Sequence, residues 1–520
     1  MARYKPYDYG QSKLLAVSFD KQILPGTFEY TVHRFIDEHV DLKPFAAHYR
    51  NERKGARAYD PAILLKIVLF AYARGITRSR EIAELARENV VCMALSADTV
   101  PHFTTIADFV ARLHRDIVSV FRDCLLVCEE LKLIGKEMFA IDGVKLPSNA
   151  AKEWSGTKEE LGHKVQKMQQ VVERLLQRHQ AADAQDAPAE LESARQKRIQ
   201  TLEAAIAKVK GFVAEHEDKL GASGKPIKSN ITDNDSAKMK TSKGVIQGYA
   251  GVALVDAQHQ VVVAAEAFGE GQEHGLLVPV LEQARESFAE LGIEPDLVRG
   301  LKLAADAGYH SEANLEYLEK VGVDGYVADT QFRKRDERFA SAERHQPQQP
   351  QAEQSGQFRP EDFSFDPQKL TCVCPAGKRL YRNGRNVTIK GYAGVKFQAA
   401  KRDCRNCPLR SRCLRHPERT AARQVVFFSG PTPAKRDSVC AKMRRKIDSA
   451  LGRHEYSKRL GIVEPVFANI CSTRGLDRFT LRGKPKVNGQ WMLFCLVHNL
   501  GKVQRYGKLE QYRRQNPVEQ

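Results

Sequence analysis

The chain has 520 residues, of which 42% are hydrophobic, and its 82 lysine and arginine residues exceed its 64 acidic residues by 18. This length predicts roughly three domains, with enough apolar content for real cores. No stretch approaches the roughly 18 uninterrupted apolar residues of a membrane span, and MARYKPYDYG is too polar for a secretory signal, so we expect a cytoplasmic protein. The basic surplus favours nucleic acid over membrane as the partner, with a basic face that only aids solubility as the alternative.

The first segment, residues 1–133, is predicted to be helical throughout. ILLKIVLFAYARGI has a broad apolar face, and SREIAELARENV and TTIADFVARLHRDIVSVF follow as further amphipathic stretches. Several short helices with a Gly-containing turn are compatible with a helix-turn-helix DNA reader. They are equally compatible with an ordinary helical packing domain, and the pattern alone leaves both open.

The next stretch, EMFAIDGVKLPSN, predicts a short strand that carries Asp142. The pattern then changes to heptad spacing in two runs that are separated by Pro188: Val165, Met168, Val172 and Leu175, then Ile199, Leu202, Ile206, Val209 and Val213. We expect a helical hairpin over residues 161–224 that pairs with itself, because each arm is short for an independent coiled coil. Dimerisation through the same seams is the alternative.

Strand periodicity returns from Lys243. GVIQGYAGVALVD and QVVVAAEAF predict neighbouring antiparallel strands, and the segments that follow alternate between helix and strand as far as DGYVAD. This alternation indicates an α/β fold with a mixed sheet covered by helices, built from residues 134–160 and 225–330. Residues 331–370, rich in Gln, Pro and charge, predict a flexible linker. Residues 371–450 form a basic, Cys-rich insertion, and residues 451–520 are mainly helical.

Three acids stand out for chemistry. In LKLAADAGYHSEANL an apolar strand ends on Asp306, so two strands of one sheet carry aspartates, as in enzymes that hold metal ions for phosphoryl transfer. A helix cap or turn is the plain alternative for Asp306 alone. The third acid, Glu464, lies beside the apolar stripe of a late helix, where Pro465 disfavours helical geometry at Glu464 itself.

The cysteines form the strongest local pattern. Cys372-x-Cys374 and Cys404-x₂-Cys407-x₅-Cys413 bring five sulfurs into one segment, and such spacing suits a structural tetrahedral Zn²⁺ site. We assign the ligands to Cys374, Cys404, Cys407 and Cys413, with Cys372 as the spare; His416 in place of one sulfur and unliganded core residues are the alternatives. The arginines around this site suit a phosphate backbone: Arg402, Arg405, Arg410, Arg412 and Arg415.

AIDGVKL, KGVIQGYAGVALVD, ADAGYHS, YSKRLGIVEPVFANI and RGKPKVNGQWMLFCLVHNLGK together resemble the DDE transposases of bacterial insertion sequences, in the group numbered eleven-eighty-two of the four/five-type superfamily. The likeness covers nearly the whole chain. It implies an RNase H-like catalytic core in which Asp142 lies on the first strand, Asp306 on the fourth and Glu464 on the helix after the last strand. It also implies two Mg²⁺ ions, or Mn²⁺, held by these three carboxylates.

The resemblance also implies contacts with DNA. Tyr456 and Arg459 match the Tyr and Arg that precede the family's glutamate, although four residues separate Arg459 from Glu464 where three are common. Cys471 stands where the family usually has Lys or Arg, and Arg474, nearly one turn further on, is the candidate for that contact.

The expected function is therefore a DNA transposase that binds terminal inverted repeats, cleaves the ends of its element and joins them to target DNA, as a homodimer or larger assembly. A related metal nuclease without strand transfer and a non-catalytic DNA-binding regulator are the alternatives.

Overall fold

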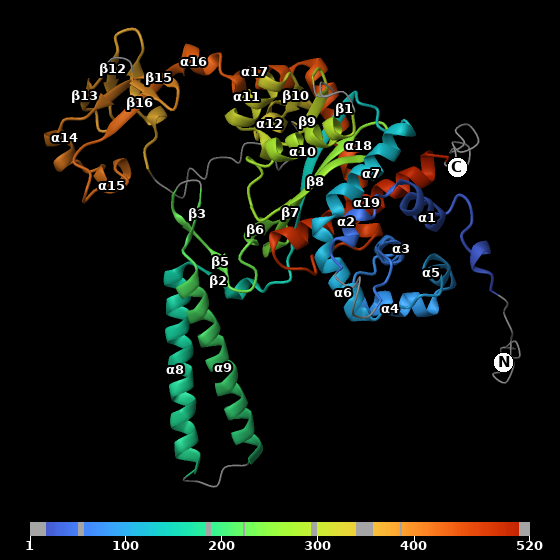
Figure 1. Cartoon of the computed structure of the whole chain (residues 1–520). Helices are drawn as coiled ribbons and strands as arrows, with labels where there is room; N and C mark the ends of the chain where they lie inside the picture. Colours follow the sequence, from blue (N-terminus) through green and yellow to red (C-terminus); the bar gives the residue numbers. More distant parts are fainter. Residues whose placement is uncertain are drawn as a thin grey trace, which may run out of the picture. The chain divides into compact units, whose positions relative to one another are not determined.

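The computed structural model describes residues 17–49, 57–183, 189–221, 224–292, 299–339, 357–384 and 387–508. The chain divides into two compact units. Unit 1 comprises Met1–Ala305, Lys320–Asp324 and Ser457–Gln520, and unit 2 comprises Asp306–Glu319 and Gly325–Tyr456. Figure 1 labels many of the helices and strands of both units.

Unit 1 begins with a group of helices. They are α1 (Phe28–His39), α2 (Lys43–Ala46), α3 (Pro61–Ala73), α4 (Ser79–Glu88), α5 (Val90–Leu95), α6 (Phe103–Arg112) and α7 (Ile117–Glu130). Asp60 caps α3 by accepting the backbone N–H of Ala62 at 2.8 Å, and Pro61 occupies the first turn, where its missing N–H costs nothing. Most of α3 is buried; its lysine, Lys66, pairs through Nζ with Oδ1 of Asp37 at 2.6 Å.

The sheet of unit 1 has the order β9-β1-β7-β6, and β8 also pairs with β7. Its strands are β1 (Met138–Pro147), β6 (Ala237–Thr241), β7 (Gly244–Asp256), β8 (Val262–Phe268) and β9 (Lys302–Ala305). β1 runs antiparallel to β7 and parallel to β9, in a register that pairs Ile141 with Ala305. Mixed strand directions and N-terminal helices confirm the α/β class that the sequence predicts.

The C-terminal helix α19 (Lys484–Tyr506) fastens this sheet to the N-terminal helices. It packs against β8 and against α1, α3 and α7. Trp491 lies against Gly251, where an added Cβ would come within 3.0 Å of the indole, and its Nε1–H donates to the carbonyl of Val252 at 2.9 Å. The side chain of Asn499 bonds both the N–H and the C=O of Val262, each at 2.8 Å.

A pair of long helices, α8 (Lys158–Asp183) and α9 (Ala189–Glu215), forms a hairpin within unit 1 (Figure 1). All nine residues of the two predicted seams belong to one hydrophobic cluster, which also takes in Leu161 and Ile231. Each arm therefore covers the apolar stripe of the other. Pro188, which was expected to break the helix, lies outside the described residues.

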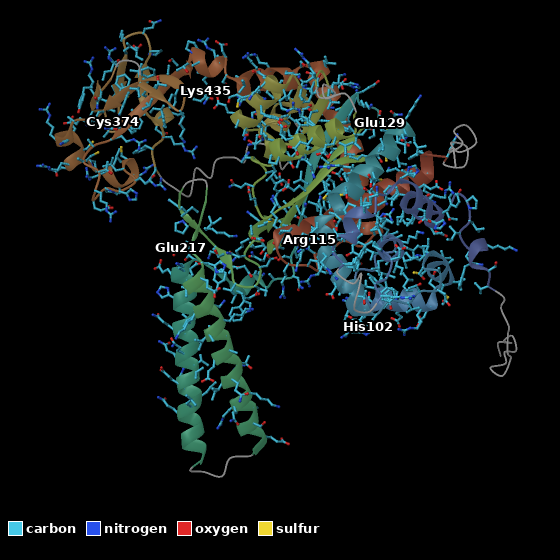
Figure 2. The ribbon with its side chains drawn as sticks, viewed as in Figure 1. His102, Arg115, Glu129, Glu217, Cys374 and Lys435 are labelled. Carbon is cyan, nitrogen blue, oxygen red and sulfur yellow. The ribbon has the colours of Figure 1, made fainter. Side chains whose placement is uncertain are left out.

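Unit 2 contains β10 (Asp324–Val327), α12 (Phe332–Arg335), α17 (Val439–Asp448) and a second sheet with the order β11-β12-β13-β15-β14, with β16 paired to β15. The strands of this sheet are β11 (Ser364–Asp366), β12 (Thr371–Val373), β13 (Arg379–Arg382), β14 (Val387–Ile389), β15 (Tyr392–Gln398) and β16 (Gln424–Pro431). Short helices α14 (Lys401–Arg405), α15 (Arg410–Cys413) and α16 (Pro433–Arg436) accompany it. Figure 2 places Cys374 in this part of the chain.

The predicted flexible linker, residues 331–370, includes ordered residues at both ends. At one end α12 buries Phe332 in a cluster with Tyr326 and Ile447, and at the other end β11 joins the second sheet beside the buried Phe363. Two aromatic side chains thus order stretches whose average composition is polar, because each supplies a large apolar surface to a core. Residues 340–356, the middle of the predicted linker, lie outside the described residues.

Candidate active site

Asp142 lies in the middle of β1 and is held on two sides. The backbone N–H of Gly143 donates to its Oδ1 at 2.8 Å, and the guanidinium of Arg459 donates to its Oδ2 at 2.5 Å. The two side chains are 23% and 9% exposed, so water screens this ion pair only in part. Arg459 belongs to α18 (Ala450–Ala468), so the pair joins the late helix to the first strand of unit 1.

Asp306 follows the last residue of β9. Its neighbour Ala305 is the register partner of Ile141, which in turn precedes Asp142, so both acids come one residue after a matched pair on adjacent parallel strands. Within unit 2, Asp306 caps the short 3₁₀ helix Ala307–Tyr309 by accepting the N–H of Gly308 at 2.6 Å. Asp306 therefore has the helix-capping role that was the alternative in the sequence analysis, and this role occupies Oδ1 of its carboxylate.

Glu464 lies on α18, five residues after Arg459, and its side chain is exposed. Five residues along an α-helix correspond to a rotation of about 140°, so Glu464 and Arg459 leave the helix on different faces. Of these two side chains, Arg459 is the one that bonds Asp142. Pro465 lies inside α18, so Glu464 is helical, contrary to the expectation that the proline disfavours helical geometry there.

Tyr456 and Arg474 have separate surroundings. The ring of Tyr456 packs edge-on against Phe332 at 5.1 Å in unit 2. In unit 1, Arg474 follows a π-helical turn (Asn469–Thr473), and it donates through Nε to Oδ1 of Asn469 at 3.0 Å and through a terminal nitrogen to the carbonyl of Ala73 at 3.2 Å. Burial lowers the pKa of Arg474. Arg474 thus uses two of its donors within unit 1, and its contact with DNA stays a prediction.

A charged cluster in unit 2 has no counterpart among the sequence predictions. Arg335 makes two hydrogen bonds to Asp329, at 2.9 and 3.1 Å, and two to Asp448, at 2.8 and 3.2 Å, while Arg444 donates to Asp329 at 3.0 Å. Burial alone would raise the pKa of Asp329, but hydrogen bonding and charge from Arg335, with the charge of Arg444, lower it. The cluster ties α12 and α17 to the end of β10. No local motif signals it, because Arg335 and Asp448 are 113 residues apart in the chain.

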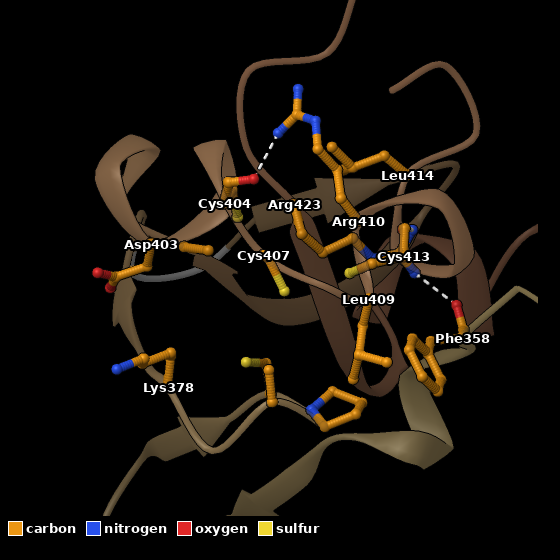
Figure 3. Close-up of a pocket in the computed structure, with 14 residues that line it drawn as sticks. Phe358, Lys378, Asp403, Cys404, Cys407, Leu409, Arg410, Cys413, Leu414 and Arg423 are labelled. Atoms are coloured by element: carbon orange, nitrogen blue, oxygen red, sulfur yellow. Dashed lines mark hydrogen bonds between the residues drawn. The ribbon is translucent and has the colours of Figure 1, made fainter. Parts of the chain in front are cut away.

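The four predicted zinc ligands lie together in unit 2. They line one cavity of about 30 Å³, in which Figure 3 shows the sulfurs of Cys404, Cys407 and Cys413 facing the interior. Burial raises the pKa of the Cys413 thiol, and the other three thiols raise it further against the opposing charge of Arg423. Cys372 is fully buried in the core of the second sheet and is not among the residues that line the cavity.

The arginines near these cysteines are partly used in the protein. Arg410 donates to the carbonyls of Cys404, Pro417 and Thr420, at 2.7, 2.5 and 2.8 Å. This side chain ties α14, which carries Cys404, to the segment that contains Pro417 and Thr420, and these bonds leave fewer of its donors for the phosphate contact that the sequence predicts. Arg402, by contrast, has a 90% exposed side chain.

Across the described ranges, no group of three or more His, Cys, Asp or Glu side chains is already placed to hold a metal ion. Carboxylate oxygens are the donors that a hard divalent cation prefers, but Arg459 already occupies Oδ2 of Asp142.

Two family models match the chain. One, described as a transposase DDE domain, covers residues 373–504, and the other, a transposase domain (DUF772), covers residues 17–112. The two matches support an insertion-sequence DDE transposase. No curated protein matches the chain significantly. The DDE-domain match includes Glu464, Arg459 and all four cavity cysteines, whereas Asp142 and Asp306 precede it. In the described part of the chain, no helix is both long and apolar enough to cross a membrane.

Proposed function

We propose that this transposase binds the terminal inverted repeats of an insertion sequence and catalyses metal-dependent DNA cleavage and strand transfer. The observation that carries the proposal is the parallel register of β1 and β9, which pairs Ile141 with Ala305 immediately before Asp142 and Asp306. In an RNase H-like catalytic core, adjacent strands carry or end at aspartates and a later helix carries a glutamate. Asp142, Asp306 and Glu464 occupy elements of these kinds in the chain, which supports the proposal. The matched transposase families support the same reaction class.

In this proposal Asp142, Asp306 and Glu464 would hold two Mg²⁺ ions, which Mn²⁺ could replace. Such ions would supply the Lewis acidity that activates a water or DNA 3′-hydroxyl and stabilises the departing oxygen. The protein orients the carboxylates: the N–H groups of Gly143 and Gly308 each fix one oxygen, of Asp142 and Asp306 respectively. Arg459 places a guanidinium beside Asp142, and this group binds phosphate oxygens well.

The surplus of 18 positive charges supports double-stranded DNA as the partner, through contacts with the phosphate backbone. Holding two element ends for joining requires at least a dimer, which is part of the proposal, as is a place in the bacterial cytoplasm near the nucleoid. Tyr456, Arg459 and Arg474 are the proposed side-chain contacts with DNA.

The test combines purified protein, Mg²⁺ and linear DNA that carries the short inverted repeats flanking the gene. Joined products on a denaturing gel are the expected result. Nicks without joined products would favour the metal nuclease without strand transfer. A shift in mobility without cutting would favour the non-catalytic regulator. Either of these two outcomes overturns strand transfer as the function.

The proposed transposase also carries a structural Zn²⁺ at Cys374, Cys404, Cys407 and Cys413. Support comes from the single cavity that these four thiols line and from their mutual effect on the pKa of Cys413. Binding would deprotonate the thiols and pull the cysteine-bearing loops inward until the four sulfurs surround the ion. Thiolates at this spacing suit a closed tetrahedral site, which would stabilise the small second sheet.

Elemental analysis of full-length protein from zinc-supplemented medium tests this assignment. We expect about one zinc per chain in the wild type, a loss of zinc in Cys404→Ser and Cys407→Ser, and retention in Cys372→Ser, because Cys372 belongs to the core and not to the cavity. Absence of zinc from the wild type, or retention in Cys404→Ser, would refute it. Co²⁺ added to metal-free wild type gives an independent readout, through the absorption of a tetrahedral thiolate complex.

A further inference from the structure

The helix that carries Glu464 contains a proline. The proline removes one intrahelical hydrogen bond, to the carbonyl three residues before the glutamate. In a regular α-helix, the N–H of residue 465 donates to the carbonyl of Gly461. Pro465 has no N–H, yet α18 continues through it to Ala468. The carbonyl of Gly461 therefore lacks its usual intrahelical donor, and an interior proline costs about 3 kcal/mol or more unless other contacts compensate.

A side chain from the sheet supplies the missing donor. Gln260, in the turn between β7 and β8, donates through Nε2 to the carbonyl of Gly461 at 3.0 Å. The turn and the helix are 201 positions apart in the chain. Gln260 has a backbone φ of 60°, a left-handed conformation that is uncommon for a residue with a side chain. The hydrogen bond thus falls on the peptide unit that the proline leaves unsatisfied.

Two residues of α19 hold Gln260 in place. The Nζ of Lys502 donates to Oε1 of Gln260 at 2.9 Å, so the amide must turn its NH₂ group toward Gly461. The imidazole of His498 approaches the backbone carbonyl of Gln260 at 2.9 Å through Nε2. The donor is therefore fixed by the buried C-terminal helix, which also packs on the sheet.

Two buried valines restrict the movement of α18 near the proline. Val463 and Val466, on either side of Glu464 and Pro465, are fully buried, whereas Glu464 and Pro465 themselves are exposed. These buried side chains restrict rotation of the helix about its axis. The bend of the helix at Gly461 can still vary, and a side-chain hydrogen bond at this position can fix it.

We infer that Gln260 is a positioning residue for Glu464. Its amide replaces the backbone donor that Pro465 removes, and so sets the direction in which α18 presents the glutamate. The inference rests on the proposed role of Glu464 as a ligand of the catalytic metal ions. It assigns Gln260 no contact with DNA or metal.

A double-mutant cycle tests it. Gln260→Glu keeps the shape of the side chain and an oxygen for Lys502, but it turns an oxygen without a proton toward the Gly461 carbonyl. Pro465→Ala restores the backbone N–H, so α18 no longer needs Gln260. In full-length protein with Mg²⁺ and end-bearing DNA, we expect Gln260→Glu to slow cleavage about tenfold and to raise the Mg²⁺ concentration for half-maximal cleavage, at unchanged DNA affinity. Combined with Pro465→Ala, the same change should have less than about a twofold effect.

Gln258→Glu, in the same turn, is the matched control for added charge, and it should cleave like the wild type. The inference is overturned if Gln260→Glu cleaves normally, if Pro465→Ala fails to rescue it, or if only the melting temperature changes and the Mg²⁺ requirement does not. A wild type that does not cut DNA would refute the proposed function instead. In that case the melting temperatures of the wild type, the two single variants and the double variant still test whether the hydrogen bond contributes to stability. Coupling between positions 260 and 465 supports the bond, and additive effects refute it.

Discussion

Arg459 on α18 donates to Oδ2 of Asp142 on β1 at 2.5 Å, across 317 positions of the chain. The contact joins the strand of one proposed catalytic acid to the helix that carries another, Glu464. Because the guanidinium is largely buried, removal of either partner leaves a charge that water solvates poorly.

Replacement of Arg459 should therefore destabilise unit 1. We expect Arg459→Ala to lower the free energy of unfolding by about 2 kcal/mol, less than for a fully buried pair because Asp142 is partly exposed. Denaturant titration followed by circular dichroism measures the change. Arg505→Ala removes an exposed charge on α19 of the same unit and should change the free energy by less than about 0.5 kcal/mol. Equal effects of the two substitutions would show that the pair contributes nothing.

His498 should make stability depend on pH. Burial lowers its pKa to about 3, while an unfolded chain has the ordinary value near 6.5. Between these values the unfolded state binds one more proton, so the stabilisation is fully present above about pH 6.5 and is lost as the pH falls toward 3. From pH 8 to pH 5, the wild type should lose about 2 kcal/mol more than His498→Gln.

Unfolding titrations of the two proteins at pH 8, 6.5 and 5 give that difference directly. Parallel pH profiles for the wild type and His498→Gln would contradict the buried neutral imidazole. The substitution must be compared as a slope and not at one pH, because it also disturbs the contacts of Nδ1 with Asn469 and of Nε2 with Gln260.

The apolar seam between α8 and α9 should stabilise the hairpin within one chain, without a second copy. Ile206 is 8% exposed in the cluster between α8 and α9, so Ile206→Ala should cost about 3 kcal/mol through lost burial and a new cavity. Lys208→Ala, on the exposed side of α9, is the control. Melting curves at several protein concentrations separate this account from dimerisation through the seams, which would make the effect of Ile206→Ala depend on concentration.

The parts of the molecule that follow from local patterns could be predicted from the sequence. Val172 and Ile206 each belong to a run of apolar residues at heptad spacing. This spacing predicts that the two helices pair through these residues. Asp142 and Asp306 likewise stand beside short apolar runs that become β1 and β9. Contacts between distant segments could not be predicted, and the Asp142–Arg459 pair is the main example, because spacing on one helix does not reveal which face meets the sheet.

Some signals in the sequence were present but incomplete. Pro465 inside an apolar helical stretch implies that the carbonyl of Gly461 needs a new donor, yet nothing local names Gln260. The spacing of Cys404 and Cys407 predicts a shared cavity, but it does not show that Arg410 is used to hold the loops around it.

The burial of Arg474 could not be predicted for a similar reason. Its local sequence marks it only as a cation near the end of a helix, whereas its hydrogen bond to the carbonyl of Ala73 spans 401 positions of the chain. The environment of this side chain therefore depends on the packing of the N-terminal helices, which spacing within the late helix does not specify.

The most direct test of the central claim compares Asp142→Asn, Asp306→Asn and Glu464→Gln with the wild type on end-bearing DNA. Each variant keeps its shape but loses a charge that the paired cations require, so Mg²⁺-dependent cleavage should fall at least about a thousandfold while gel-shift affinity stays within about twofold. Addition of a chelator should abolish cleavage by the wild type in the same way. Metal-dependent nicking that persists in any one of the three variants would contradict the assignment of that carboxylate.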